Sequence, residues 1–180
     1  MVVEEKVVVR LSRDGGLNGM EVKGSMTLTV GDEGAGQLRI VTEGGHDDAS
    51  KAFQYQSHPN VNKPLFTAGG LVGLKAADRA FPTASPVGVL RWRYTNKDDD
   101  ISQVPLTLTC WPEEGAGGVV NVNLEYTLQF EHLTLTDVVV AVPLGGDVVP
   151  NVRSCDGSWK HNTRENTLLW RIDTLNADNA

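Results

Sequence analysis

Apolar and polar residues alternate with a period of two along most of the chain. The clearest run extends from Met20 to Val30, where Met26 and Leu28 alternate with Thr27 and Thr29. Such alternation predicts a strand with one face in a core and the other in water. We therefore expect Met26 and Leu28 to be buried and the two threonines to be exposed.

Similar alternation predicts strands over residues 7–11, 106–110 and 122–130. An unbroken apolar run over residues 138–142 predicts a strand buried on both faces. Turn signals such as Asp14-Gly15-Gly16 separate these runs at strand-like spacing. No segment of ten or more residues has a helical period, and at most one helical turn is expected near residues 67–74. The pattern predicts an all-β chain built as an antiparallel β-sandwich.

A polar run over residues 96–100 lies between two predicted strands. It predicts an internal boundary near residues 97–104, with one subdomain over residues 1–101 and a second over residues 102–180.

Composition narrows the function. The net charge is −7 and the basic residues form no cluster, which argues against a nucleic-acid binder or a protein held on an anionic membrane by charge. The N-terminus lacks the features of a signal peptide, and there is no glycosylation sequon. Cys110 and Cys155 have no metal-ligand spacing and are expected to be reduced, mostly buried thiols. These features predict a cytosolic protein.

Candidate chemistry is sparse. The four histidines are not spaced as zinc ligands; His46-Asp47-Asp48 is expected at a hairpin tip, and Asp98 to Asp100 in a solvated linker. We expect no metal, no cofactor, no disulfide and no catalytic site. For each of the four tryptophans core packing is the favoured interpretation, and a peptide groove rimmed by Arg and Lys is the alternative. The long segment over residues 57–66 suits recognition.

Several motifs together resemble the mu homology domain of the delta subunit of coatomer. They are DGGLNGMEVKGSMTLTV, SHPNVNKPLF, GLKAADRAFP, GVLRWRY, PLTLTCWP, VNVNLEYTL and LTDVVVAVPL, and the resemblance extends from about Glu5 to about Asn176. It implies an elongated two-subdomain β structure shared with the medium subunits of clathrin adaptors. It also implies a non-catalytic adaptor domain of the COPI coat, which returns cargo from Golgi to endoplasmic reticulum and lies peripherally on Golgi membranes and COPI vesicles.

The implied partners are short tryptophan-containing peptides of tethering factors and Arf GTPase-activating proteins, with other coatomer subunits bound through regions outside this chain. An apolar pocket with a basic rim would suit such peptides when they also carry acidic residues. The candidate contacts, chosen as basic or aromatic positions expected to be exposed, are Lys63, Phe66, Lys75, Arg79, Arg91 and Arg93.

Two departures from the family matter. Clathrin-adaptor medium subunits bind tyrosine-based signals through an aspartate in the first strand, whereas this strand reads Val7-Val8-Val9-Arg10, so tyrosine-signal binding is not expected. The family domain also continues beyond Ala180, so both subdomains are expected to lack closing strands and the fragment to self-associate or be marginally stable. The alternatives are a purely structural spacer of the coat and an unrelated carbohydrate-binding β-sandwich.

Overall fold

The computed structural model describes residues 1–43, 52–96, 100–146 and 148–179, and it divides into two compact units, Met1–Ile101 (unit 1) and Ser102–Ala180 (unit 2). Strands dominate both units, and the all-β, antiparallel fold class is confirmed. The strands are β1 (Val2–Leu11), β2 (Leu17–Leu28), β3 (Ile40–Val41), β4 (Gln54–Ser57), β5 (Leu71–Val72), β6 (Val87–Asn96), β7 (Leu106–Glu114), β8 (Val120–Leu128), β9 (Leu135–Pro143), β10 (Ser158–Asn162) and β11 (Thr167–Leu175).

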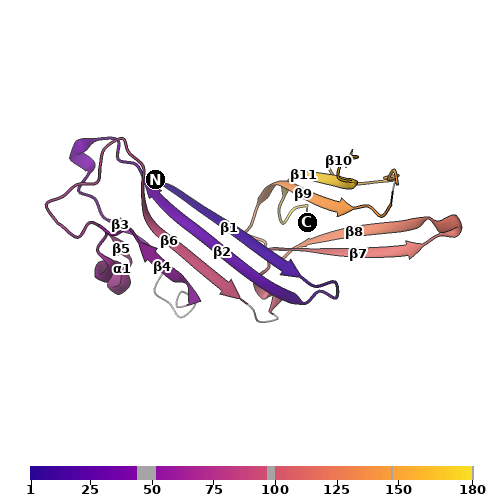
Figure 1. Ribbon diagram of the computed structural model, residues 1–180, viewed down its shortest axis with the longest axis horizontal. Helices are drawn as coiled ribbons and strands as arrows, with labels where there is room; N and C mark the ends of the chain where they lie inside the picture. The colour runs from indigo at the N-terminus through magenta and orange to yellow at the C-terminus, as the bar shows by residue number, and fades with distance from the viewer. Residues whose placement is uncertain (44–51, 97–99, 147, 180) are drawn as a thin grey trace. The chain divides into compact units, whose positions relative to one another are not determined.

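Unit 1 is built on a four-stranded antiparallel sheet with the order β1-β2-β6-β4 (Figure 1). The predicted Asp14-Gly15-Gly16 turn joins β1 to β2, and the Ser12 backbone N–H donates to the Gly16 carbonyl at 2.7 Å across it. Gly15 has φ +92°, a left-handed conformation that glycine adopts without steric cost. Strands β3 and β5 form a separate two-stranded sheet beside the helix α1 (Lys63–Gly69).

The predicted faces of β2 are confirmed. Met26 and Leu28 are 8% and 6% exposed, whereas Thr29 is exposed and Thr27 is half-buried. Both apolar side chains belong to a core cluster that also contains Phe66 of α1. The helix therefore covers the apolar face of this sheet.

One position on that face has no side chain. Gly24 of β2 lies directly opposite Trp92 of β6, and the Trp92 indole occupies the space where a Cβ of Gly24 would stand. The Trp92 Nε1–H donates to the Glu5 carboxylate of β1 at 2.5 Å. The indole consequently spans β2, from β6 to β1.

Unit 2 packs the β7–β8 hairpin against a three-stranded antiparallel sheet of order β10-β11-β9 (Figure 1). The sheet contributes Val140, Trp170 and Ile172 to a buried cluster. From the hairpin, Tyr126 meets Trp170 with ring centroids 5.5 Å apart. Burial raises the pKa of the Tyr126 phenol, and the nearby Asp156 carboxylate raises it further.

Two local predictions were wrong. Strand β9 is not buried on both faces, because Val139 is 49% exposed while Val140 is buried. Only one face of the three-stranded sheet is covered by the hairpin, so the apolar run has an open side. The helix begins at Lys63, earlier than the predicted helical turn near residues 67–74.

No helix among the described residues is long and apolar enough to cross a membrane.

Candidate functional site

Lys63 is the first residue of the helix α1. Its N-cap is Asn62, whose side-chain oxygen accepts a hydrogen bond from the Leu65 backbone N–H at 3.2 Å, and Pro64 lies in the first turn. Both are favoured helix-start residues. The helix ends at Gly70, which adopts a left-handed conformation with φ 64° and donates its N–H to the Phe66 carbonyl. Lys63 is exposed at the start of this capped helix.

Lys75 lies in a segment that returns beside the residues preceding the helix. Val61 and Leu74 form an antiparallel bridge, and the Lys75 backbone N–H donates to the Asn60 carbonyl at 2.9 Å. Lys63 therefore comes just after one of these two paired segments, and Lys75 lies at the opposite end of the pairing. Both side chains are exposed.

Arg79 lies in the turn that follows. Its backbone N–H donates to the Ala76 carbonyl at 3.2 Å, and its side chain is exposed. Lys63, Lys75 and Arg79, here called the α1 basic group, thus come from two neighbouring segments of unit 1.

Phe66 is not exposed, in contrast to the expectation for a contact residue. It is 6% exposed and packs edge-on against Tyr55 of β4, with ring centroids 5.3 Å apart. Phe66 is buried because its position on α1 faces the sheet. Phe66 holds α1 on the sheet rather than presenting an aromatic surface to a ligand.

Arg91 and Arg93 lie on the opposite face of the four-stranded sheet from α1. Side chains alternate along β6, so both arginines point away from the face that carries Trp92. Trp92 and Tyr55 pack against the core that contains Phe66. The structure therefore places the two arginines on the side of the sheet opposite α1, although all six candidates lie in unit 1.

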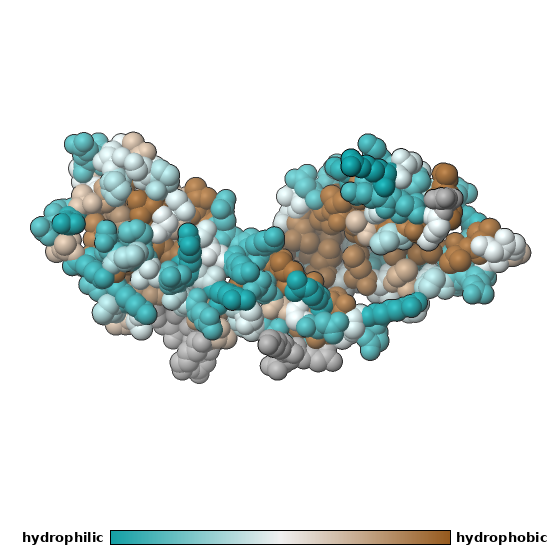
Figure 2. Space-filling model, viewed as in Figure 1, coloured by the Kyte–Doolittle hydropathy of each residue, from teal (hydrophilic) through white to brown (hydrophobic). Residues whose placement is uncertain are grey.

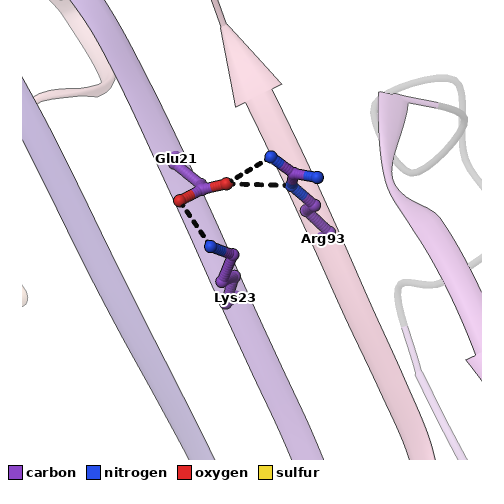
Figure 3. Close-up of polar contacts among 3 residues, drawn as sticks. All are labelled: Glu21, Lys23 and Arg93. Carbon is purple, nitrogen blue, oxygen red and sulfur yellow. Dashed lines mark hydrogen bonds and ion pairs between the residues drawn. The ribbon is translucent and has the colours of Figure 1, made fainter.

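Arg93 forms an ion pair with Glu21 of β2 (Figure 3). Its Nη2 and Nε atoms lie 2.6 and 2.9 Å from Glu21 Oε1, and Lys23 Nζ lies 2.8 Å from Glu21 Oε2. The hydrogen bond from Lys23, together with Arg93, lowers the pKa of the Glu21 carboxyl. One carboxylate thus engages two cations on the polar face of the sheet.

A different surface was missed by the sequence interpretation. Trp111 was expected in the core, yet it is 56% exposed on the outer face of the β7–β8 hairpin. The same core interpretation fails for Trp159, which is 42% exposed, and holds for Trp170, which is 7% exposed. The alternation along β7 could have located Trp111, because it shares the odd positions with Thr107 and Thr109 rather than the apolar even ones.

Neither cysteine lies in a disulfide. Cys110 is exposed, in contrast to the expected burial, and Cys155 is half-buried. Among the described residues no group of three His, Cys, Asp or Glu side chains could hold a metal ion. His46-Asp47-Asp48 lies outside the described residues, as do two residues of the Asp98 to Asp100 run.

Comparison with known proteins identifies similar chains. A model of the adaptor complexes medium subunit family matches residues 1–180. A probable coatomer subunit delta of Caenorhabditis elegans is 34% identical over 177 residues, and the coatomer subunit delta of Arabidopsis thaliana is 36% identical over 183 residues. The alignments cover 98% and 99% of this chain. The chain spans about a third of the length of each relative, 33% in both cases.

Solved structures show the same likeness. The mu-homology domain of yeast delta-COP-I, complexed with a Dsl1 WxWxV peptide, superimposes with a TM-score of 0.80 and 28% identity, covering 97% of this chain and 69% of that domain. The zebrafish (Danio rerio) Fcho1 mu homology domain with a bound Eps15 peptide has a TM-score of 0.65 at 16% identity, covering 99% of this chain and 73% of that one. The second likeness establishes the fold alone.

Proposed function

Because the chain belongs to the adaptor complexes medium subunit family and resembles the mu homology domain of coatomer delta subunits, we propose that it is a non-catalytic peptide-recognition domain of the COPI coat. Its ligands are short tryptophan-containing motifs of partner proteins. The members of this family are coat and adaptor subunits, a non-catalytic kind of protein.

One observation carries the proposal. The similar yeast domain is bound to a peptide whose motif contains two tryptophans, and the likeness extends over 97% of this chain. A tryptophan side chain offers a large apolar surface with one N–H donor, and such residues dominate the energy of many interfaces.

We assign the basic rim of the peptide site to the α1 basic group, Lys63, Lys75 and Arg79. All three are exposed, and they lie on segments held by the Asn62 cap and the Val61–Leu74 bridge, so little ordering is needed on binding. Arg93 is a weaker candidate because Glu21 already engages its guanidinium. Acidic residues beside a tryptophan motif would complement the lysines and the arginine, mainly by speeding association.

The test is a calorimetric titration with a WxWxV peptide flanked by acidic residues, beside the same peptide with both tryptophans replaced by alanine. We expect binding of the first peptide only. The triple variant Lys63→Glu, Lys75→Glu, Arg79→Glu should bind at least about tenfold more weakly, because three attractive rim charges become repulsive. Arg91→Glu is the matched control, since Arg91 is also exposed but lies on the opposite face of the sheet.

The outcomes distinguish whether the domain binds such peptides from where on the domain they bind. Equal affinity for both peptides, or no binding of either, would contradict peptide recognition and leave a purely structural spacer of the coat. A loss with Arg91→Glu and not with the triple variant would keep the function and move the site to the other face.

The cellular context is proposed on the same basis. The partners would be tethering factors and Arf GTPase-activating proteins that carry such motifs, with other coatomer subunits bound elsewhere on the whole protein. The domain would be cytoplasmic and held on Golgi membranes and COPI vesicles only through the coat. Colocalisation of the tagged full-length protein with a Golgi marker tests this placement.

A further inference from the structure

The outer face of the β7–β8 hairpin carries an exposed indole among carboxylates and amides. Trp111 is 56% exposed and lies directly opposite Asn123, and Glu113 lies opposite Asn121 in the same ladder. An open depression on this face is lined by Trp111, Glu113, Asn121, Val122, Asn123 and Glu125. Tryptophan usually packs in the core of a protein. A large aromatic side chain on a polar strand face makes no such contribution.

The opposite face of the hairpin supplies the packing of unit 2. Leu106, Leu124 and Tyr126 contact the buried cluster of the three-stranded sheet. Figure 2 shows apolar surface gathered over unit 2. The residues that line the depression beside Trp111 are polar apart from Val122. The outer face is therefore not needed to hold the unit together.

The hairpin itself carries acidic residues and no basic ones. No Lys or Arg occurs from Ser102 to Val152, a stretch that includes six acidic residues and all of β7, β8 and β9. Unit 2 as a whole has four Lys and Arg against ten Asp and Glu, whereas unit 1 has twelve against thirteen. Most of the net charge of −7 thus belongs to unit 2.

The edge of the indole is already oriented. Trp111 Nε1 donates to Glu125 Oε2 at 3.4 Å, and Asn123 Nδ2 donates to Glu125 Oε1 at 2.9 Å. The first bond places the edge of the indole beside a carboxylate, while its exposure leaves the ring open to solvent. A cation placed over the ring would meet the negative π face and a carboxylate together.

We propose that this face binds a basic segment of a partner protein, with an arginine stacked on Trp111 and its guanidinium bonded to Glu113 or Glu125. Arginine suits the site better than lysine, because its planar, weakly hydrated group stacks on aromatic rings and donates two hydrogen bonds to one carboxylate. The site is separate from the α1 basic group and does not depend on the proposed function. The two units would select peptides of opposite charge.

Other occupants fit less well. Nucleic acids and anionic membranes would be repelled by a stretch without cations. A neutral sugar could stack on Trp111 and bond to the asparagines, but it would gain nothing from the uniform negative charge.

The experiment uses the whole chain and an acetylated Gly/Ser heptapeptide with two arginines, monitored by the indole N–H resonances in NMR. Trp111→Phe identifies the Trp111 resonance. We expect this resonance to shift on titration, with an affinity that falls as the salt concentration rises. The same peptide with citrulline, a neutral analogue of arginine, should cause no shift.

Variants locate the contact. Trp111→Ala should weaken binding about two- to fivefold, the range of an exposed cation–π contact. Glu113→Gln with Glu125→Gln should weaken it at least about threefold. Trp159→Ala and Glu131→Gln, which change another exposed tryptophan and another exposed acid of unit 2, should leave the affinity unchanged.

Three results would overturn the proposal. They are an unshifted Trp111 resonance with the arginine peptide, equal shifts with the citrulline peptide, or a shift with a neutral oligosaccharide in the absence of any response to arginine.

Discussion

At the residue scale, the contact between Gly24 and Trp92 leaves no room for a side chain at position 24 of the sheet of unit 1. A Cβ at Gly24 would lie 2.0 Å from Trp92 Cε2, and the indole is held by its bond to Glu5. We therefore expect Gly24→Ala to lower the free energy of unfolding by about 1–3 kcal/mol, as overpacking does in well-packed sites. Urea denaturation measures the change.

The control for that prediction is Gly88→Ala in β6, because nothing lies within 4 Å of a Cβ added there. Its effect should be within about 0.5 kcal/mol. In a Trp92→Leu background the cost of Gly24→Ala should shrink, since the clashing indole is gone. An equal cost with and without Trp92 would show that the strain has another origin.

The Glu21 carboxylate predicts a pH dependence. Lys23 and Arg93 lower the pKa of this carboxyl in the folded protein. The ionised carboxylate therefore stabilises the fold fully at pH values above the pKa of the unfolded state. This stabilisation is lost as the pH falls through the pKa of the folded state. Thermal unfolding of the protein and of Glu21→Gln should therefore differ at pH 7 and converge as the pH is lowered below about 4. Glu131→Gln serves as the control for an exposed acid. A difference in unfolding temperature between the protein and Glu21→Gln that stays constant over the pH range would contradict the role given to Glu21.

At the element scale, the short helix α1 depends on its cap. Asn62→Ala removes the acceptor for the Leu65 N–H and should lower the free energy of unfolding by about 1 kcal/mol. Fraying of the first turn would also release Lys63, so the affinity for the acidic tryptophan peptide should fall. Asn62→Ser, which retains a capping oxygen, should restore both quantities. Chemical denaturation and calorimetry supply the two measurements.

The sequence predicts individual strands better than it predicts what covers them. Alternation located the buried face of β2 through Met26 and Leu28, because a period of two relates neighbouring positions directly. It could not show that Val139 of β9 is uncovered, since covering requires a second layer formed by distant residues. The candidate site failed similarly at Phe66, which looked like a loop residue but lies on the buried side of α1, against the sheet.

The helix itself was predictable in principle. Asn62 and Pro64 are start signals and Gly70 is a stop signal, and together they define the helix more closely than its weak periodicity does. The placement of Arg91 and Arg93 on the side of the sheet opposite α1 is different. It depends on which face of the sheet the helix covers, and no local pattern states that.

At the scale of the whole molecule, two units of one fold class differ in electrostatic character. Unit 1 is nearly neutral and carries its lysines and arginines on several segments, whereas unit 2 is strongly acidic. The overall charge of −7 therefore describes neither unit well. A domain that recruits partners through both charge types gains specificity from repulsion as well as attraction, because each surface rejects the ligand of the other.

The absence of Lys and Arg from Ser102 to Val152 also determines which reagents and enzymes can act on unit 2. Trypsin has no cleavage site in β7, β8 or β9, so a digest releases them on one long peptide that ends at Arg153. Lys160, exposed on β10, is the single lysine of this unit. Amine-reactive cross-linkers, acetylation and lysine-linked ubiquitin therefore have one point of attachment there, and an amine-reactive cross-link from unit 2 to any partner must start at that residue.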